Sequence, residues 1–152
     1  METESLLDWA RPRPKSRAVI CDIDDTICVQ FDQPIQIACQ TLTALDRAIH
    51  VHYITARPET SREGTERFIL DHRLPGCRNL HFCPSHQSSR LHKAEAMVRL
   101  MKEHLVLVSI GDHDEDEHAS LSVGIPFVRI RDDNHVEAWA EFVRLVSQSA
   151  NP

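Results

Sequence analysis

The chain has 152 residues, 41% of them hydrophobic and 26% charged, which is typical of one globular domain and excludes a disordered or fibrous protein. No apolar run approaches the roughly 20 residues that span a bilayer, and the first residues lack the apolar stretch of a signal peptide, so we expect a cytoplasmic protein without membrane contact. The formal net charge of −6 opposes non-specific attraction to nucleic acid and anionic lipid.

The chain begins with a basic arm, residues 1–17. Its positive charges are Arg11, Arg13, Lys15 and Arg17. Such a segment either binds an anionic partner or stays a solvated tail, and the sequence leaves both interpretations open. Residues 18–150 are expected to form a single domain. The five cysteines are odd in number and include no C-x-x-C pair, which indicates reduced thiols.

The first half of the domain alternates apolar runs with helical patterns. A strand is predicted at Ala18–Ile23, where a short apolar run rich in β-branched residues contains the first acidic side chain. Apolar residues then recur every three or four positions over Ile35–Ile49, which indicates a helix. A second strand is predicted at Val51–Thr55, followed by a helix from about Pro58 to His72.

The second half continues this alternation. Leu105–Gly111 is apolar almost throughout, as expected for a central parallel strand. The other elements predicted there are a strand at Asn79–Cys83, a helix over Ala94–Leu105, a helix at Glu115–Val123 capped by Gly124, a strand at Ile125–Ile130 and a helix around Trp139–Val146. Five strands alternating with helices predict an α/β fold with a doubly wound, Rossmann-like, parallel five-stranded sheet covered on both faces.

Acidic and hydroxyl side chains lie where three of the predicted strands end. Asp22 and Asp24 close the first strand, Thr55 closes the second, and Asp112 and Asp116 follow the fourth. Ligands of open α/β sheets bind at the carboxyl ends of the strands. We therefore expect these side chains to converge on one pocket.

These residue types suit phosphoryl transfer to a carboxylate, which needs a nucleophile, a cation, donors for the phosphate oxygens and an acid for the leaving group. Asp22 and Asp24 can serve as nucleophile and acid/base if the chain turns sharply after the strand. Thr55 offers a hydroxyl donor, and Lys93 offers a positive charge among the carboxylates. Asp112 can complete an all-oxygen magnesium site with Asp22 and a backbone carbonyl.

Four segments resemble, in order, the four motifs of the haloacid dehalogenase (HAD) superfamily. They are DIDDT at Asp22–Thr26, YITAR at Tyr53–Arg57, Lys93, and GDHDED at Gly111–Asp116. The resemblance covers residues 18 to 130 and implies a HAD-like fold and a Mg²⁺-dependent phosphatase that acts through an aspartyl-phosphate. An Asp at position 24 points to phosphatase chemistry, and Asp25 stands where the superfamily commonly has glycine.

The resemblance also implies a role for each motif residue. Asp22 would be the nucleophile and a magnesium ligand, and Asp24 the general acid/base, which would ligate magnesium through its backbone carbonyl. Lys93 would steady the phosphoaspartate. The other residues implied are Thr55 as a donor to a phosphoryl oxygen, Ala56 and Arg57 as further substrate contacts, Asp112 as a magnesium ligand, and Asp116 as a ligand acting directly or through another group. Arg57 has an alternative interpretation, an ion pair with Glu59 or Asp25.

Superfamily members insert cap domains after the first or second motif, and neither interval is long enough here. Between Thr26 and Thr55 there are 28 residues, and between Thr55 and Lys93 there are 37. We therefore expect no cap domain and an open site. Uncapped sites in this superfamily serve large substrates or borrow a lid from another subunit. A homo-oligomer is therefore one of the open alternatives.

Within the superfamily, the nearest resemblance is to the 3′-phosphatase domain of phage-type polynucleotide kinases. It rests on ITARPE before a helix, then HRLPG and a short strand before Lys93. It implies a nucleic acid 3′ end as the phosphorylated substrate. The chain has no G-x-x-x-x-G-K-[ST] loop, so a kinase or ligase partner would be a separate protein.

Other functions remain open on sequence alone. A small-molecule phosphatase acting on nucleotides or sugar phosphates would use the same residues. A catalytically silent binding module or a signalling phospho-aspartate domain could keep the fold. A receiver domain, however, would place its phosphoacceptor after the third strand, which here ends in Cys83-Pro84. The pairs His50/His52 and His81/Cys83 lack the spacing of a structural zinc site.

Overall fold

The computed structural model describes residues 14–148, so Arg11 and Arg13 of the predicted arm lie outside the described residues. The elements, in chain order, are β1 (Ser16–Cys21), β2 (Cys28–Val29), β3 (Gln33–Pro34), α2 (Gln36–Thr43), β4 (His50–Pro58), η1 (Glu59–Ser61), α3 (Arg62–Asp71), β5 (Leu80–Cys83), α4 (Ser89–Glu103), β6 (His104–Gly111), α5 (Asp114–Val123), β7 (Phe127–Arg129) and α6 (His135–Gln148).

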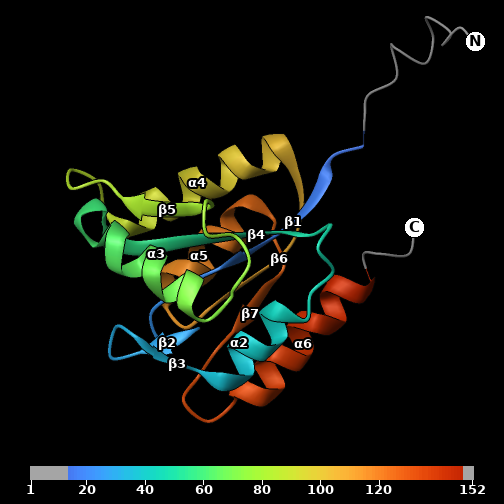
Figure 1. The fold of residues 1–152 in the computed structure, drawn as a ribbon. Helices are drawn as coiled ribbons and strands as arrows, with labels where there is room; N and C mark the ends of the chain where they lie inside the picture. The colour runs from blue at the N-terminus through green and yellow to red at the C-terminus, as the bar shows by residue number, and fades with distance from the viewer. Residues whose placement is uncertain (1–13, 149–152) are drawn as a thin grey trace, which may run out of the picture.

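Five of the strands form one sheet in the order β5-β4-β1-β6-β7, and every pair is parallel (Figure 1). The predicted doubly wound parallel sheet is therefore confirmed. From the central β1 the chain moves outward through β4 and β5, then crosses back to β6 and β7. The direction in which successive strands are added to the sheet thus reverses between β1 and β6. Open α/β sheets bind their ligands at such a point.

Helices cover both faces of the sheet. On one face α2, α3 and α6 bury the larger core, in which the rings of Trp139 and Phe142 meet edge to face at 5.1 Å. On the other face α4 and α5 cover a smaller core that contains Ile20 and Met97. Val19 faces the larger core and its neighbour Ile20 the smaller, because successive side chains of a strand point to opposite faces. The central strands are therefore apolar on both sides.

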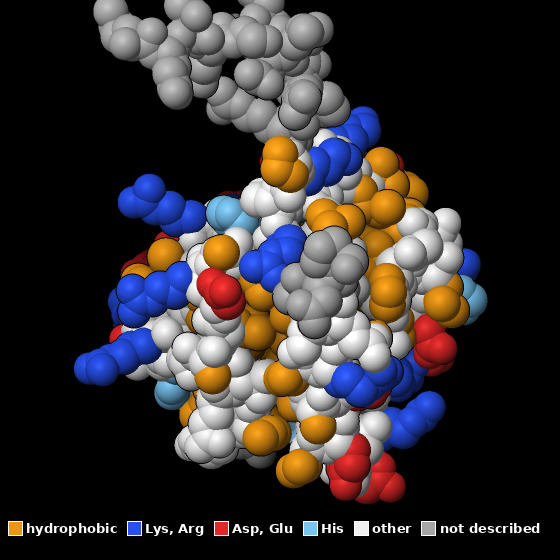
Figure 2. Space-filling view, turned by 90° about the vertical axis from the view of Figure 1, so that its right-hand side faces the viewer, with side chains coloured by type: hydrophobic (Ala, Val, Ile, Leu, Met, Phe, Trp, Pro, Cys, Tyr) orange, Lys and Arg blue, Asp and Glu red, His pale blue; other side chains and the backbone are white. Residues whose placement is uncertain are grey.

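The amino ends of the strands form the end of the molecule that faces the viewer in Figure 2. Basic, acidic and apolar side chains are intermixed over this surface. The carboxyl ends, where the motif residues lie, are at the opposite end of the molecule.

Several boundaries differ from the sequence prediction by a few residues, among them the start of α4 at Ser89 and the extent of β4, His50–Pro58; two of the differences have a clear local cause. β1 begins at Ser16 rather than at position 18, because Ser16 pairs with His104 at the start of β6 and their side chains share a hydrogen bond of 2.8 Å. The division of the chain at residue 17 stays a prediction. The helix predicted to reach Ile49 ends at Thr43. Beyond it the Asp46 carboxylate accepts the backbone N–H of Ala48 at 2.8 Å, a local turn that competes with helix.

A small hairpin, β2–β3, follows the first motif and was not predicted. Gln30 and Phe31 between its strands have positive φ values of 49° and 74°. Among the described residues, and besides parts of β4, the interval between Thr26 and Thr55 holds only this hairpin and α2, and the interval between Thr55 and Lys93 holds only η1, α3, β5 and the start of α4. Neither of these two intervals therefore contains a cap domain.

All five cysteines are free of disulfide bonds in the structure, and their redox state in the cell stays a prediction. None of the helices within residues 14–148 combines the length and the apolar character needed to cross a membrane.

Candidate active site

Asp22 directly follows β1, and its backbone N–H donates to the carbonyl of Ile110 in β6 at 3.0 Å. The chain then turns sharply, as expected. The N–H groups of Thr26 and Ile27 both donate to the carbonyl of Ile23, at 3.2 and 2.9 Å, and Asp25 has a φ of 59°. This turn sends Asp22 and Asp24 to different surroundings.

Three carboxylates meet at the carboxyl ends of β1 and β6. One oxygen from each of Asp22, Asp112 and Asp116 lies within 4.8 Å of the others. The ammonium group of Lys93 is 2.5 Å from Asp116 Oδ1 and 3.4 Å from Asp22 Oδ1. Asp22, Lys93 and Asp116 are nearly inaccessible to solvent, at 7%, 2% and 3% exposure. Four of the predicted site residues are thus in contact.

Burial dominates the electrostatics of this cluster. It raises the pKa of Asp22 well above its ordinary value, Asp116 raises it further, and Lys93 acts in the opposite direction. The pKa of Asp112 is also raised, chiefly by burial. Burial acts to lower the pKa of Lys93, but Asp22 and Asp116 outweigh it and raise that pKa. The two carboxylates therefore favour the charged form of Lys93.

The carboxylate cluster fits a hard divalent cation. One ammonium against three carboxylates leaves two uncompensated negative charges in a nearly dry site. Asp112 also acts to raise the pKa of Asp22, so binding a proton is one way to relieve the repulsion between these carboxylates. A cation could replace that proton, and an all-oxygen donor set is the one that magnesium prefers. The two oxygens of Asp116 already accept from Lys93 and from the backbone N–H of His113 at 3.2 Å, so Asp22 and Asp112 hold the more available oxygens.

Gly111 allows Asp116 to reach the cluster. A Cβ at position 111 would lie 2.5 Å from Asp116 Oδ2 and 2.7 Å from its Cγ. Contacts this short do not occur in real structures, so any side chain here would displace Asp116. The glycine of the GDHDED motif is thus explained by close approach.

Thr55 and Ala56 lie at the end of β4. Thr55 is fully buried, and its Oγ1 accepts the backbone N–H of Arg57 at 3.0 Å. That bond uses Oγ1 as an acceptor and leaves its proton available for donation. Ala56 beside it is exposed. Substrate contact by these two residues stays a prediction.

Arg57 is an interior residue that binds Asp24. Its Nε and Nη2 donate to the two carboxylate oxygens of Asp24 at 3.0 and 2.7 Å. Nη1 donates to Thr65 Oγ1 at 3.0 Å, Nη2 donates to the Phe31 carbonyl at 2.8 Å, and the guanidinium lies 3.9 Å above the Phe31 ring. The ion pair foreseen for Arg57 therefore exists, but with Asp24 and not with Glu59 or Asp25.

Asp24 is consequently set apart from the other carboxylates. Its side chain is 49% exposed and faces Arg57, whereas the Asp22 carboxylate faces Lys93. Proton donation to a group bound at Asp22 would require the Asp24 side chain to rotate away from Arg57. The predicted ligation of magnesium by the Asp24 backbone carbonyl stays a prediction.

His92 supports the site and was missed in the sequence. It is 2% exposed, and its Nε2 lies 3.1 Å from the carbonyls of both Thr55 and His81. This ring ties α4 to the ends of β4 and β5 and so fixes the adjacent Lys93. Its position next to the motif lysine was the only available signal.

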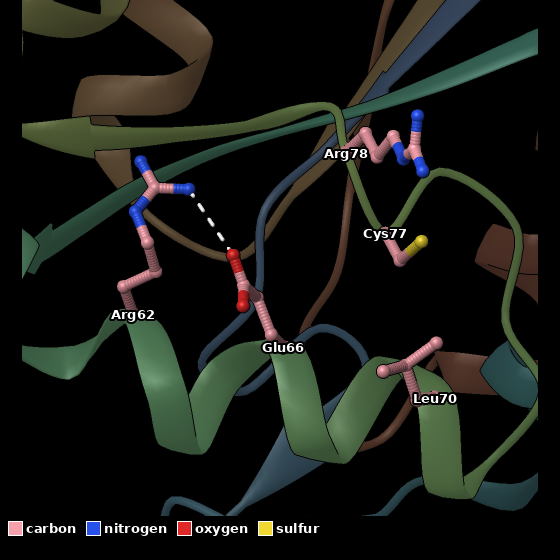
Figure 3. Close-up of a pocket in the computed structure, with 5 residues that line it drawn as sticks. All are labelled: Arg62, Glu66, Leu70, Cys77 and Arg78. Atoms are coloured by element: carbon pink, nitrogen blue, oxygen red, sulfur yellow. Dashed lines mark hydrogen bonds and ion pairs between the residues drawn. The ribbon is translucent and has the colours of Figure 1, made fainter.

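A larger hollow lies away from the carboxylates. A cavity of about 520 Å³ runs along α3 and is lined by Arg62, Glu66, Leu70, Cys77 and Arg78 (Figure 3). Arg62 pairs there with Glu66 at 3.4 Å and also with Glu59. The carboxylate that lines this cavity, Glu66, is 42% exposed, whereas the carboxylate cluster gathers three acids around a buried lysine, so we take the cluster as the candidate active site.

Models of protein families give no match to this chain, and neither do curated protein sequences. Solved structures do. A chain in the structure of the Pnkp1/Rnl/Hen1 RNA repair complex has a TM-score of 0.66 and 19% identity, over 76% of this chain and 42% of that one. The class C acid phosphatase from Bacillus anthracis has a TM-score of 0.60 and 12% identity, over 92% of this chain and 81% of that one.

These similarities agree with the resemblance drawn from the four motifs and support the HAD-like assignment of the fold. The present chain spans less than half the length of the RNA repair chain that it matches. At these identities the comparison concerns the fold alone.

Proposed function

We propose that the protein is a magnesium-dependent phosphomonoesterase in which Asp22 is the nucleophile. One observation carries the proposal. The buried carboxylate of Asp22 stands at the point where the strand order reverses, beside the ammonium of Lys93 and two further carboxylates. This arrangement offers a nucleophile and charge compensation at the place where ligands of such sheets bind.

In the first half of the proposed reaction an oxygen of Asp22 attacks the phosphorus, and the bond to the leaving oxygen breaks. Asp24 gives that oxygen a proton, so an alcohol departs and an aspartyl-phosphate remains. Lys93 offsets the negative charge that the phosphoryl group brings to Asp22, and the Thr55 hydroxyl donates to a phosphoryl oxygen.

In the second half a water attacks the phosphorus of the aspartyl-phosphate. Asp24, now ionised, takes a proton from the water, and the bond from phosphorus to the Asp22 oxygen breaks. Inorganic phosphate leaves and Asp22 is regenerated. The net reaction converts a phosphomonoester and water into an alcohol and inorganic phosphate.

Asp22 and Asp112 would hold the magnesium ion, with Asp116 fixing Lys93 beside them. The bound ion would supply neutralisation of the phosphoryl oxygens. Without it, two carboxylates and a phosphate dianion would repel each other in a site of low exposure.

For the substrate we propose a polynucleotide 3′-phosphate. The absence of a cap among the described residues supports a large substrate, because a small ligand would stay largely in water. The similarity to a chain of an RNA repair complex supports nucleic acid, and a separate kinase or ligase partner would follow from it. The similarity to a class C acid phosphatase over 92% of this chain favours a second candidate, a small phosphomonoester.

The test is phosphatase assay of the purified chain with an aryl phosphate, a 3′-phosphorylated oligonucleotide and a nucleoside 3′-monophosphate. We expect turnover with Mg²⁺, none in excess chelator, and none for Asp22→Asn. Asp71→Asn, an exposed acid at the end of α3, is the matched control and should keep full activity. Undiminished turnover by Asp22→Asn would refute the mechanism, and better use of the mononucleotide would select the small-molecule candidate.

A further inference from the structure

A second, polar cavity adjoins the carboxylate cluster. It has a volume of about 310 Å³ and lies at the carboxyl ends of β6 and β7. Its lining residues are Asp25, Asp112, Arg129, Ile130, Arg131 and Asp132. Asp112 belongs both to this cavity and to the cluster, so the cavity opens directly beside the proposed reaction centre. None of the roles assigned above uses its two arginines.

Arg129 is held in place but keeps free donors. Its Nη1 donates to Asp114 at 2.9 Å and to Glu117 at 3.0 Å, both on α5. Its Nε is buried and has no hydrogen-bond partner in the described part of the chain. A buried donor without an acceptor is costly, so a partner for this edge of the guanidinium would be favourable. The Nε edge of an arginine, together with the second amino group, suits two oxygens of a phosphate.

Arg131 supplies a second positive charge to the lining of the cavity. Its side chain is exposed and makes no ion pair with any described residue. The backbone around both arginines is fixed by Asn134, whose side chain accepts from the N–H of Arg131 at 2.6 Å and donates to the carbonyl of Arg129 at 3.1 Å. The loop is thus ordered before any ligand arrives.

The acidic residues of the cavity do not make it a cation site. Asp25 and Asp132 are exposed, so water and salt screen their charges. Asp112 is the ligand proposed for magnesium, which would offset its charge. Arg129 is already paired with two acids, so the positive charge comes from Arg131, and the planar donors of both arginines favour an oxyanion over a further cation.

The geometry points to this cavity as the binding site for a second phosphate of the substrate, held by Arg129 and Arg131 while the first reacts at Asp22. This inference rests on the proposed function and specifies its substrate class. The substrate is a nucleoside 3′-phosphate that carries a second phosphate on the 5′ side of the same nucleoside. That phosphate could be the next diester of a polynucleotide or the 5′-monoester of a nucleoside 3′,5′-bisphosphate.

The test compares kcat/KM for four substrates with Mg²⁺: an aryl phosphate, a nucleoside 3′-monophosphate, the corresponding 3′,5′-bisphosphate and a 3′-phosphorylated oligonucleotide. The kcat/KM values for the two-phosphate substrates should exceed that for the nucleoside 3′-monophosphate by at least about tenfold. This ratio corresponds to the weakest hydrogen bonds that charged groups make. Arg131→Ala should remove most of that preference. Arg129→Lys keeps a charge for Asp114 but loses the planar edge, and it should reduce the preference too.

Arg47→Ala is the matched control, since Arg47 is an exposed arginine between α2 and β4 at the other end of the sheet. It should leave all four values unchanged. A preference for both two-phosphate substrates would show that a monoester suffices as the second group. A preference for the oligonucleotide alone would show that the second group is a diester. Either result would support the inference. An unchanged preference in both arginine variants would overturn it. A wild-type chain inactive on every substrate would instead refute the proposed function.

Discussion

Replacing Arg57 with methionine should destabilise the protein more than any surface arginine change. The methionine keeps much of the apolar volume and removes the guanidinium. That group joins four parts of the chain: Asp24, the β2–β3 hairpin, the end of β4 and α3. The side chain of Arg57 is 5% exposed, so water cannot replace the lost contacts in the native fold.

The size of the effect follows from what each partner loses. The Phe31 carbonyl loses a charged hydrogen bond worth about 1.5–3 kcal/mol. The cation–π contact with the Phe31 ring adds about 0.5–1 kcal/mol. Thr65 loses less, because its hydroxyl still donates to the carbonyl of Ser61 at 2.8 Å. Asp24, at 49% exposure, regains water. Together we expect a loss of about 2–4 kcal/mol in the free energy of unfolding.

Urea unfolding at neutral pH, followed by circular dichroism, measures this loss. The control is Arg62→Met. Arg62 also lies over an aromatic ring, at 4.6 Å from Phe82, and pairs with two glutamates, but its side chain is 42% exposed. That change should hardly shift the urea midpoint, since exposed pairs contribute little. Equal midpoints for the two variants would show that the burial of Arg57 has no energetic consequence.

Three further predictions concern individual residues. Gly111→Ala should abolish phosphatase activity while the far-UV spectrum stays native, because the added Cβ displaces Asp116; activity above about a tenth of wild type would contradict the close approach. Asp24→Asn should slow hydrolysis of alkyl phosphates more than that of nitrophenyl phosphate, which leaves without a proton; an equal loss on both would assign Asp24 another role. Burial, with His81 and other histidines nearby, lowers the pKa of His52 from 6.5 to about 4, so the unfolded chain binds the extra proton. Stability should therefore fall as the pH drops from about 6.5 toward 4, by about 1 kcal/mol at pH 5 after allowance for solvent screening, and His52→Gln should lessen the fall measured by urea unfolding.

Much of the fold could be predicted because apolar periodicity reports burial directly. The run at Leu105–Gly111 is apolar on both sides since β6 lies inside the sheet, and Gly124 ends α5 with a φ of 79° as a capping glycine should. The rule that ligands bind at the carboxyl ends of strands then predicts that Asp22, Asp112 and Asp116 converge, and their oxygens do lie within 4.8 Å of one another.

The missed features depend on tertiary contacts or on very short segments. The β2–β3 hairpin has two-residue strands, too short for a period, and its turn uses Gln30 and Phe31 in left-handed conformations that sequence assigns to glycine or asparagine. The pairing of Arg57 with Asp24 joins residues 33 positions apart. Local patterns carry no information about such a contact.

The proposed reaction centre is divided between two parts of the protein that should differ in cooperativity. Asp22 and Asp112 extend from neighbouring central strands whose backbones are hydrogen-bonded to each other, so they should be released only on global unfolding. Asp24 instead precedes a two-stranded hairpin that Arg57 fastens to the rest of the chain. In the Arg57→Met variant, which lacks this attachment, we expect low urea to open the hairpin before the signal of buried Trp139 changes. In that range the protein should lose turnover of poor leaving groups first, and amide exchange in the hairpin should precede exchange in β1 and β6.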